Sequence, residues 1–412
     1  MGFAFWKAAV AAALLALAWG LAAPQLAAAQ AKFSDNKIKI GVLDDFSGQY
    51  CFDDCMHPVR AVKLAIEDFG GKIGDATIEV IYADHQNKPD VGASIANKWF
   101  DTEQVDVIVD VVNSAVAFAV QEIARNKGKA VLYSEAGSAD LTGPACAPYS
   151  AQWTYDTFQL GKTIGEAVPQ LGKTWFILGA DYAFGKGLAA AVKDNVEKAG
   201  GTVVGTVFHP FGAQDMSSFM LQAQASKAQV IALANAGGDM FNSIKAAHEF
   251  GLVDSGVKIV PLSLDLPLIA SAGGLDNVQG MMVTLPWFPG ISPAAADFAK
   301  RMDAAKGNEQ YMWAGLYSAV HHYLSAAKAT GTDDPKAIFD WMQKNPINDE
   351  FATNGVLRPD GRMVHDVYLV KVKKPSESKG PNDLATLVST IPGDKAFRPM
   401  DQGGCPLVAK KG

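Results

Sequence analysis

The chain has 412 residues, which is long for one hydrophobic core and predicts two domains. Hydrophobic residues make up 49% of it and charged residues 19%, a balance typical of globular proteins and not of disordered ones. The formal net charge of -7 leaves no basic field for nucleic acid, so we expect no nucleic-acid partner.

Residues 1–31 have the pattern of an export signal. Lys7 supplies a positive start, residues 8–21 form an apolar segment, and residues 27–31 offer small side chains for cleavage. Elsewhere the sequence shows no continuous apolar stretch of the roughly 18 residues that cross a membrane. We therefore expect a soluble mature protein, exported to the periplasm.

Strands and helices alternate from residue 37 onward. The pattern predicts a strand at 37–43, a helix opened by Pro58 and closed by Gly70 and Gly71, a strand at 77–83 and a helix at 89–100. Such alternation is typical of a doubly wound parallel sheet covered by helices.

Residues 105–138 continue this pattern and contain the first candidate site. A buried strand at 105–112 runs into Asn113 and Ser114, which are favoured residues at a helix N-terminus. A second strand at 129–134 ends in a small-residue loop with Gly137 and Ser138. If the strands are parallel, both turns lie at one sheet edge and offer N–H groups and hydroxyls to an anionic group of a small ligand.

A second α/β unit begins near Trp153. We expect helices and strands alternating at 158–171, 174–179, 187–199, 202–208, 217–227, 230–235, 239–250 and 257–262. Because ligands collect at the carboxyl ends of parallel strands, residues that follow these strands are candidates for an apolar binding wall and its polar contacts. They are Asp181, Tyr182, Phe184, Asn235, Asp239, Ser263 and Asp265.

The C-terminal part is expected to be a strand at 280–285, helices at 293–306, 313–330 and 335–344, and a hairpin. The turn chemistry of residues 357–362 predicts that hairpin, with residues 367–372 as its return strand. Residues 375–412 are rich in Pro, Gly and Lys and are expected to run over the surface.

Signatures of enzymes are missing from the sequence. It contains no G-x-S-x-G, no H-E-x-x-H and no C-x-x-C, and none of its seven histidines sits in a motif with a nucleophile. Residues 179–187, GADYAFGKG, resemble a phosphate loop, but the glycine spacing is one residue too long and Gly187 stands where a magnesium-binding hydroxyl is needed. We expect neither catalysis nor a cofactor.

The chain has four cysteines, Cys51, Cys55, Cys146 and Cys405, and export makes them candidates for disulfides. Three pairings are possible; we favour Cys51 with Cys55, and Cys146 with Cys405, which would tie the tail to the first domain. Residues 51–57 could instead hold a metal through thiolates, carboxylates and His57. A bridge would remove the two best ligands, so we expect no metal.

The export signal, the segment IKIGVLDDFSG in the first strand, the restart near Trp153 and the segment DYAFGKGLAAAV together resemble type I periplasmic binding proteins of the leucine/isoleucine/valine group. The resemblance covers about residues 37–366 and implies two doubly wound Rossmann-like lobes joined by three crossovers, near 152–155, 285–287 and 345–355. Lobe 1 would comprise residues 37–152 and 287–345, and lobe 2 residues 153–286 and 346–374, with the tail packed on the surface.

The resemblance also implies a function. Such proteins bind a small solute between the lobes, close around it and deliver it to an inner-membrane ABC permease. Segments such as LTGPACAPYSAQWTYDTFQLG and GGCPLV resemble the branch associated with aromatic carboxylates. Amino-acid binders carry a run of Ser and Thr where this chain has Ala115 and Val116, and their acidic partner for the ammonium falls near Ser263. An aromatic acid is therefore favoured over an amino acid.

The expected site combines both lobes of a monomer. In lobe 1 Asn113, Ser114, Gly137 and Ser138 would grip a carboxylate. In lobe 2 Tyr182 and Phe184 would cover the apolar part of the solute, and Asn235, Asp239 or Asp265 would bond a distal group. At the crossovers Trp153, Tyr155 and Trp287 would line the cleft. Two alternatives stay open: a branched-chain or other amino acid as the solute, and a periplasmic ligand sensor for a separate signalling partner.

Overall fold

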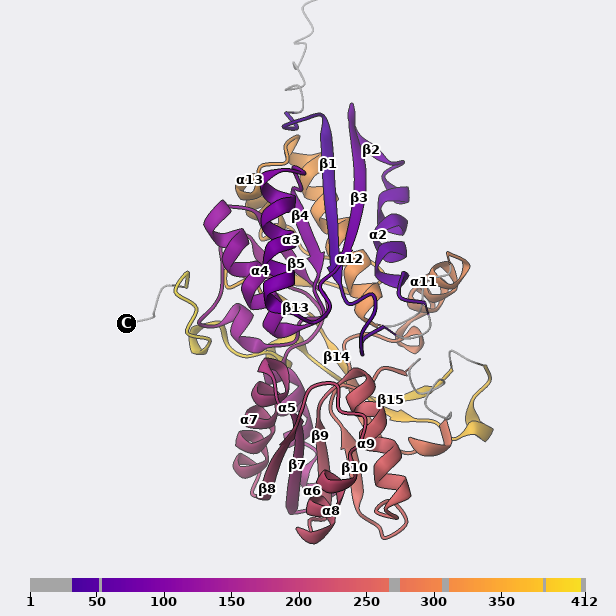
Figure 1. Ribbon diagram of the computed structural model, residues 1–412. Helices are drawn as coiled ribbons and strands as arrows, with labels where there is room; N and C mark the ends of the chain where they lie inside the picture. Colours follow the sequence, from indigo (N-terminus) through magenta and orange to yellow (C-terminus); the bar gives the residue numbers. More distant parts are fainter. Residues whose placement is uncertain (1–31, 52–53, 267–274, 306–310, 381–382, 409–412) are drawn as a thin grey trace, which may run out of the picture.

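The computed structural model describes residues 32–51, 54–266, 275–305, 311–380 and 383–408, so the predicted signal peptide lies outside the described residues. The chain forms two lobes stacked end to end, each a sheet flanked by helices (Figure 1). Among the described helices, none is both long and apolar enough to cross a bilayer.

Lobe 1 is built on a six-stranded sheet in the order β2-β3-β1-β4-β5-β6. Its buried central strands β1, β4 and β5 run parallel and in register, so that Leu43 lies beside Asp110 and Asp110 beside Tyr133. The carboxyl ends of these three strands therefore meet at one edge, which faces lobe 2. The elements are β1 (Lys37–Asp44), α2 (His57–Asp68), β2 (Lys72–Ile73), β3 (Ala76–Asp84), α3 (Pro89–Asp101), β4 (Val107–Asp110), α4 (Ser114–Lys127), β5 (Ala130–Tyr133) and β6 (Ser150–Gln152).

Lobe 2 has a four-stranded parallel sheet in the order β10-β9-β7-β8. The helix predicted at 158–171 is two helices, because Pro169 cannot donate a backbone hydrogen bond within a continuous helix. The elements are α5 (Thr157–Gly165), α6 (Val168–Leu171), β7 (Thr174–Ala180), α7 (Ala183–Lys198), β8 (Thr202–His209), α8 (Ser217–Ala225), β9 (Val230–Ala234), α9 (Gly237–Glu249) and β10 (Lys258–Pro261).

The chain crosses between the lobes more than once. It enters lobe 2 after β6 and leaves it after β11 (Met282–Leu285), and α12 (Tyr311–Thr330) then packs against α2, β4 and β5 of lobe 1. The neighbouring helices are α11 (Pro293–Ala304) and α13 (Pro335–Met342). The predicted fold class, two doubly wound α/β lobes of the type I periplasmic binding protein, is confirmed.

The predicted C-terminal hairpin is partly wrong. The partner of β12 (Val356–Leu357) is β13 (Met363–Val364), because the turn is tight and Gly361 takes a φ of 85°. The expected return strand is β14 (Val367–Val372), which instead pairs antiparallel with β11 and with β15 (Ala385–Ile391). The tail thus adds a largely exposed edge strand and a short helix, α14 (Gly393–Ala396).

Both favoured cysteine pairings are present. Cys146 and Cys405 are bridged with Cα atoms 5.6 Å apart, which fastens the tail to lobe 1. Cys51 and Cys55 are bridged with Cα atoms 5.0 Å apart, at the start of α2. Neither pair therefore offers a thiolate.

Candidate functional site

A cavity lies where the two lobes meet. It occupies about 510 Å³, including the part open to solvent. Its walls come from the carboxyl ends of strands in both sheets and from the first turn of α12, the position at which open α/β sheets bind ligands. The lining residues are Tyr50, Val112, Glu135, Tyr155, Tyr182, Phe184, Ala236, Gly237, Ser263, Asp265, Tyr311, Met312 and Trp313.

The walls are mainly aromatic. Tyr155 meets Phe184 edge to face with ring centres 6.3 Å apart, and it meets Tyr311 in the same way at 5.8 Å. Tyr182 lies against Phe184 at 6.1 Å. Burial raises the pKa of the Tyr155 and Tyr182 phenols, so these hydroxyls stay neutral. The rings provide large apolar faces for a small solute.

A loop of lobe 1 closes the cavity against lobe 2. Asp45 shapes this loop by accepting hydrogen bonds from the backbone N–H groups of Gly48, at 2.7 Å, and Tyr50, at 3.0 Å. The Tyr50 hydroxyl is hydrogen-bonded to that of Tyr182 across the cleft. Beside it, the Gly238 N–H donates to the Gln49 carbonyl over 3.1 Å. The two lobes are therefore in direct contact at the cavity.

The charged groups in the cavity wall are acidic. Glu135 is 5% exposed and Asp265 2%, and among the described lining residues none is Lys, Arg or His. Burial raises the pKa of Glu135 well above its ordinary value, and the neighbouring carboxyl groups of Asp110, Asp44 and Asp265 raise it further. The wall therefore carries negative or protonated carboxyl groups and offers no side-chain cation.

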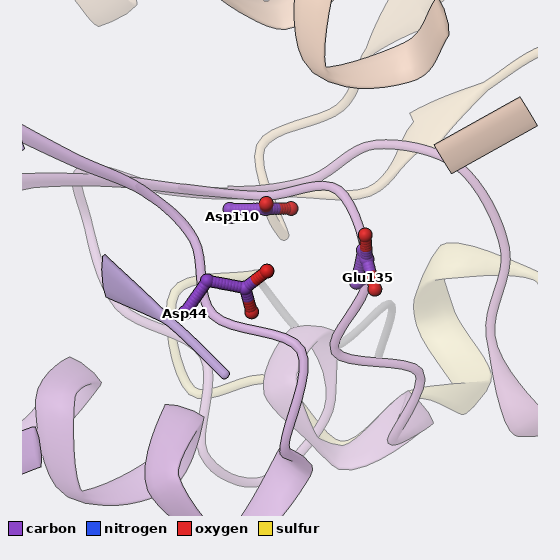
Figure 2. Close-up of side chains that lie close together, drawn as sticks. All are labelled: Asp44, Asp110 and Glu135. Atoms are coloured by element: carbon purple, nitrogen blue, oxygen red, sulfur yellow. The ribbon is translucent and has the colours of Figure 1, made fainter. Parts of the chain in front are cut away.

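Behind Glu135 lie two more buried carboxyl groups, those of Asp44 and Asp110 (Figure 2). The three side chains, which we call the carboxylate trio, each offer an oxygen within 4.8 Å of the other two. Asp44 ends β1, Asp110 ends β4, and Glu135 follows β5 by two residues. We did not select any of the three from the sequence. An acidic residue at the end of each of three neighbouring strands was the available signal.

The four residues predicted to grip a carboxylate are bonded within lobe 1. Asn113 caps α4 as predicted, with its side-chain oxygen accepting from the N–H of Ala115 at 2.9 Å and of Val116 at 3.3 Å. Ser114 Oγ accepts from the Ser138 N–H at 3.1 Å. None of Asn113, Ser114, Gly137 and Ser138 lines the cavity, so their contact with a solute stays a prediction.

Gly137 nevertheless shapes the site, because a Cβ on it would lie 2.6 Å from ring atoms of Tyr155 and Phe184. Of the other predicted residues, Tyr155, Tyr182, Phe184, Ser263 and Asp265 line the cavity.

The remaining predicted residues lie outside the wall of the cavity. Asn235 Nδ2 lies 2.9 Å from Ser243 Oγ inside lobe 2, and Asp239 Oδ2 accepts from the Gly212 N–H at 3.1 Å. Asp181 is paired with Lys186 at the surface, at 2.6 Å.

The two predicted crossover tryptophans are core residues. The indole N–H of Trp153 donates to Ser318 Oγ at 3.0 Å, and that of Trp287 donates to the Glu350 carbonyl at 2.9 Å. The aromatic residues that sequence reasoning missed are Tyr50, in the closing loop, and Tyr311 and Trp313, at the start of α12. No local motif marks these three residues: the return of α12 to lobe 1 brings Tyr311 and Trp313 to the cleft, and the loop after β1 carries Tyr50 there.

Comparison with known proteins shows the family. A family model described as periplasmic binding protein matches residues 37–381. The Leu/Ile/Val-binding protein homolog 6 of Brucella abortus (strain 2308) is 26% identical over 368 residues, which cover 84% of this chain and 90% of that protein.

Solved structures agree with this assignment. A periplasmic binding protein from Burkholderia mallei is 43% identical with a TM-score of 0.87, over 90% of this chain and 99% of that one. A branched chain amino acid ABC transporter periplasmic ligand-binding protein from Burkholderia xenovorans LB400 is 36% identical with a TM-score of 0.79, over the same shares. A solute-binding protein from R. palustris in complex with 4-hydroxybenzoate has the same fold at 21% identity and a TM-score of 0.79, over 87% of this chain and 97% of that one. This chain belongs to the periplasmic binding protein family.

Proposed function

We propose that the protein is the solute-binding component of an ABC importer, which captures a small solute between its lobes and delivers it to a membrane permease. The observation that carries this proposal is the cavity, which has walls from both lobes and is closed by the contact of Tyr50 with Tyr182. Family membership supports it, because members of the family bind solutes and do not catalyse reactions on them.

Closure gives the mechanism of capture. The contacts of Gln49 and Tyr50 with lobe 2 exist only when the lobes are together. A solute that touches both lobes adds its binding free energy to the closed state and shifts the population toward it. The permease would then recognise the closed, loaded form.

The aromatic walls support a solute with an aromatic or compact apolar body, as the sequence predicts. The R. palustris protein of the same fold, in complex with 4-hydroxybenzoate, is a precedent for such a solute. The predicted carboxylate has less support, because Glu135 and Asp265 would have to be protonated beside an anion. A branched-chain amino acid is the second candidate, favoured by the name of the B. xenovorans relative.

The test is calorimetric titration of the mature protein with benzoates, phenylpropanoids, aromatic keto acids and branched amino acids. Small-angle scattering of the same samples would report closure. We expect at least one solute class to bind and to make the protein more compact, and to stabilise it by mass action. A binding solute that left the scattering unchanged would contradict capture by closure.

Two adjacent glycines provide a matched pair of variants for the closing contact. Gly237 has a φ of 61°, and a Cβ there would lie 2.8 Å from the Tyr50 ring and 2.9 Å from the Gln49 carbonyl. A Cβ on Gly238 would meet Gln49 at an ordinary 3.6 Å. Because a Cβ on Gly237 would clash with Tyr50 and Gln49 only when the lobes are together, we expect Gly237→Ala to weaken solute binding about tenfold, which corresponds to about 1.4 kcal/mol. Gly238→Ala should bind like wild type; equal affinities in the two variants would argue against this contact.

A further inference from the structure

The carboxylate trio is buried without a compensating charge. Asp44 is 5% exposed, Asp110 0% and Glu135 5%. Among the described residues, no Lys or Arg pairs with any of the three. Burying ionised carboxyl groups together is costly unless a cation or protons neutralise them.

The nearest basic side chain cannot supply the charge. His85 is fully buried, and its Nε2 lies 3.8 Å from Asp44 Oδ1. Its Nδ1 accepts a hydrogen bond from the Asn87 N–H at 3.0 Å, so Nδ1 carries no proton. Burial lowers the pKa of His85 to about 4, which leaves the ring neutral in the periplasm.

The protein supplies few hydrogen-bond donors to the trio. Asp44 accepts from the backbone N–H groups of Val112, at 3.0 Å, and of Asp45. Asp110 is hydrogen-bonded to Ser134 Oγ, and its carboxyl group lies within hydrogen-bonding reach of that of Asp44. Asp110 Oδ2 is completely buried and has no donor among the described residues. His85 Nε2, which carries the proton of the neutral ring, lies 3.8 Å from Asp44 Oδ1 and lacks a hydrogen-bond partner, so it gives the trio neither a charge nor a close hydrogen bond. Such orphaned polar atoms are rare in proteins and call for an unseen partner.

The spacing suits a compact cation. Carboxylate oxygens lie 2.3–2.6 Å from calcium, so one such ion joins oxygens up to about 4.6–5.2 Å apart. One oxygen from each member of the trio lies within 4.8 Å of the other two, which is inside that span. A primary ammonium, with three N–H donors, has matching hydrogen-bonding geometry. Glu135 belongs to both the trio and the cavity wall, so a cation there faces the aromatic rings, which also attract positive charge.

We propose that the cavity takes a cation, held by Asp44, Asp110 and Glu135, which is either a hard metal ion or the ammonium group of the solute. This inference rests on the proposed role as a solute receptor and specifies the chemistry of its ligand. The solute neutralises the trio, and the aromatic wall encloses the rest of it.

Two arms of one experiment distinguish the sources of charge. In the metal arm the mature protein is stripped with chelator and titrated with Ca²⁺ and with Tb³⁺, whose emission reports transfer from the neighbouring Trp313 indole. In the ammonium arm it is titrated with tyramine, and with 4-hydroxyphenylacetate as an anion of similar shape. Each titration is repeated on Glu135→Gln and on Glu67→Gln, a matched change at an exposed position of α2.

We expect one arm to saturate at one equivalent with wild type, to weaken at least tenfold in Glu135→Gln, and to be unchanged in Glu67→Gln. Melting curves of the ligand-free variants verify that both fold. Equal cation binding by Glu135→Gln and wild type, or no binding in either arm, would overturn the proposal. If 4-hydroxyphenylacetate alone bound and closed the lobes, the receptor function would stand and the cation would be wrong.

Discussion

Two groups of polar residues lie at the same edge of the lobe 1 sheet and are used differently. The polar groups of the turns at Asn113–Ser114 and Gly137–Ser138 are hydrogen-bonded within lobe 1. Asn113 caps α4, and Ser114 accepts from the Ser138 N–H. The carboxylate trio, of which Glu135 lines the cavity, has no Lys or Arg partner among the described residues, and Asp110 Oδ2 lacks a hydrogen-bond donor. Polar groups that are hydrogen-bonded to one another stabilise the folded lobe, whereas buried polar groups without a partner destabilise the ligand-free protein and gain free energy when a ligand binds them.

Neutralising the trio should have the largest effect on the ligand-free protein. In the double variant Asp44→Asn with Glu135→Gln, like charges no longer crowd Asp110, so the free energy of unfolding should rise by roughly 1–3 kcal/mol. Urea denaturation at pH 7.5 measures this change. A fall in stability would show that the trio stabilises the fold, as the hydrogen-bonded turns do, and would contradict the difference between the two groups.

The gain in that variant should grow with pH. Burial raises the pKa of all three trio residues, that of Asp110 to about 7. For Asp44 and Glu135, the neighbouring carboxyl groups raise the pKa further. The native protein thus binds more protons than the unfolded chain, so the stability that the trio contributes is present below pH 4 and is lost as pH rises through about 7. His85 and Asp265 are present in both wild type and the double variant, so their contributions cancel in the difference. The difference in unfolding free energy should therefore be larger at pH 8 than at pH 5, and a constant difference would contradict the raised pKa values.

Removing the cap of α4 tests the other side of the comparison. Asn113→Ala should lower stability by about 1 kcal/mol, because the N–H groups of Ala115 and Val116 lose their acceptor. Asn113→Ser, which retains a capping oxygen, is the matched control. Solute affinity by calorimetry should change less than twofold in both variants. A large loss of affinity in Asn113→Ala would place the residue in the binding site after all.

The smallest effect is expected for Ser114→Ala. It deletes one buried hydrogen bond, to the Ser138 N–H, and should cost roughly 0.5–1.5 kcal/mol of stability with little effect on solute binding. Thermal unfolding and calorimetry of the same preparation measure both quantities. If affinity fell tenfold at unchanged stability, the prediction from the sequence that Ser114 binds a solute carboxylate would be right, and the proposal that the trio binds the solute would be weakened.

Much of the fold is readable from local patterns. The alternation of strands and helices, the cap at Asn113 and the Cys51–Cys55 bridge have local causes, and that bridge leaves Cys146 and Cys405 to pair with each other. The pairing of β14 with β11 and β15 was not predicted, because strand partners depend on segments far apart in sequence.

The site was predictable only in part. Tyr155, Tyr182, Phe184 and Asp265 follow strands or crossovers and were found by that rule. Tyr311 reaches the cavity because α12 returns to lobe 1, which no local pattern encodes. Small polar residues at a strand end look alike in sequence whether they bind each other or a ligand. Hydrogen-bond partners decide the question, and these appear only in the folded protein.

A crystal structure of the mature protein soaked with Tb³⁺, and in parallel with tyramine, tests the central claim most directly. The prediction is density for the cation of one probe between the carboxyl groups of Asp44, Asp110 and Glu135, with the lobes closed around it. A trio left empty with both probes, and an aromatic acid bound instead to Ser114 and Ser138, would contradict it.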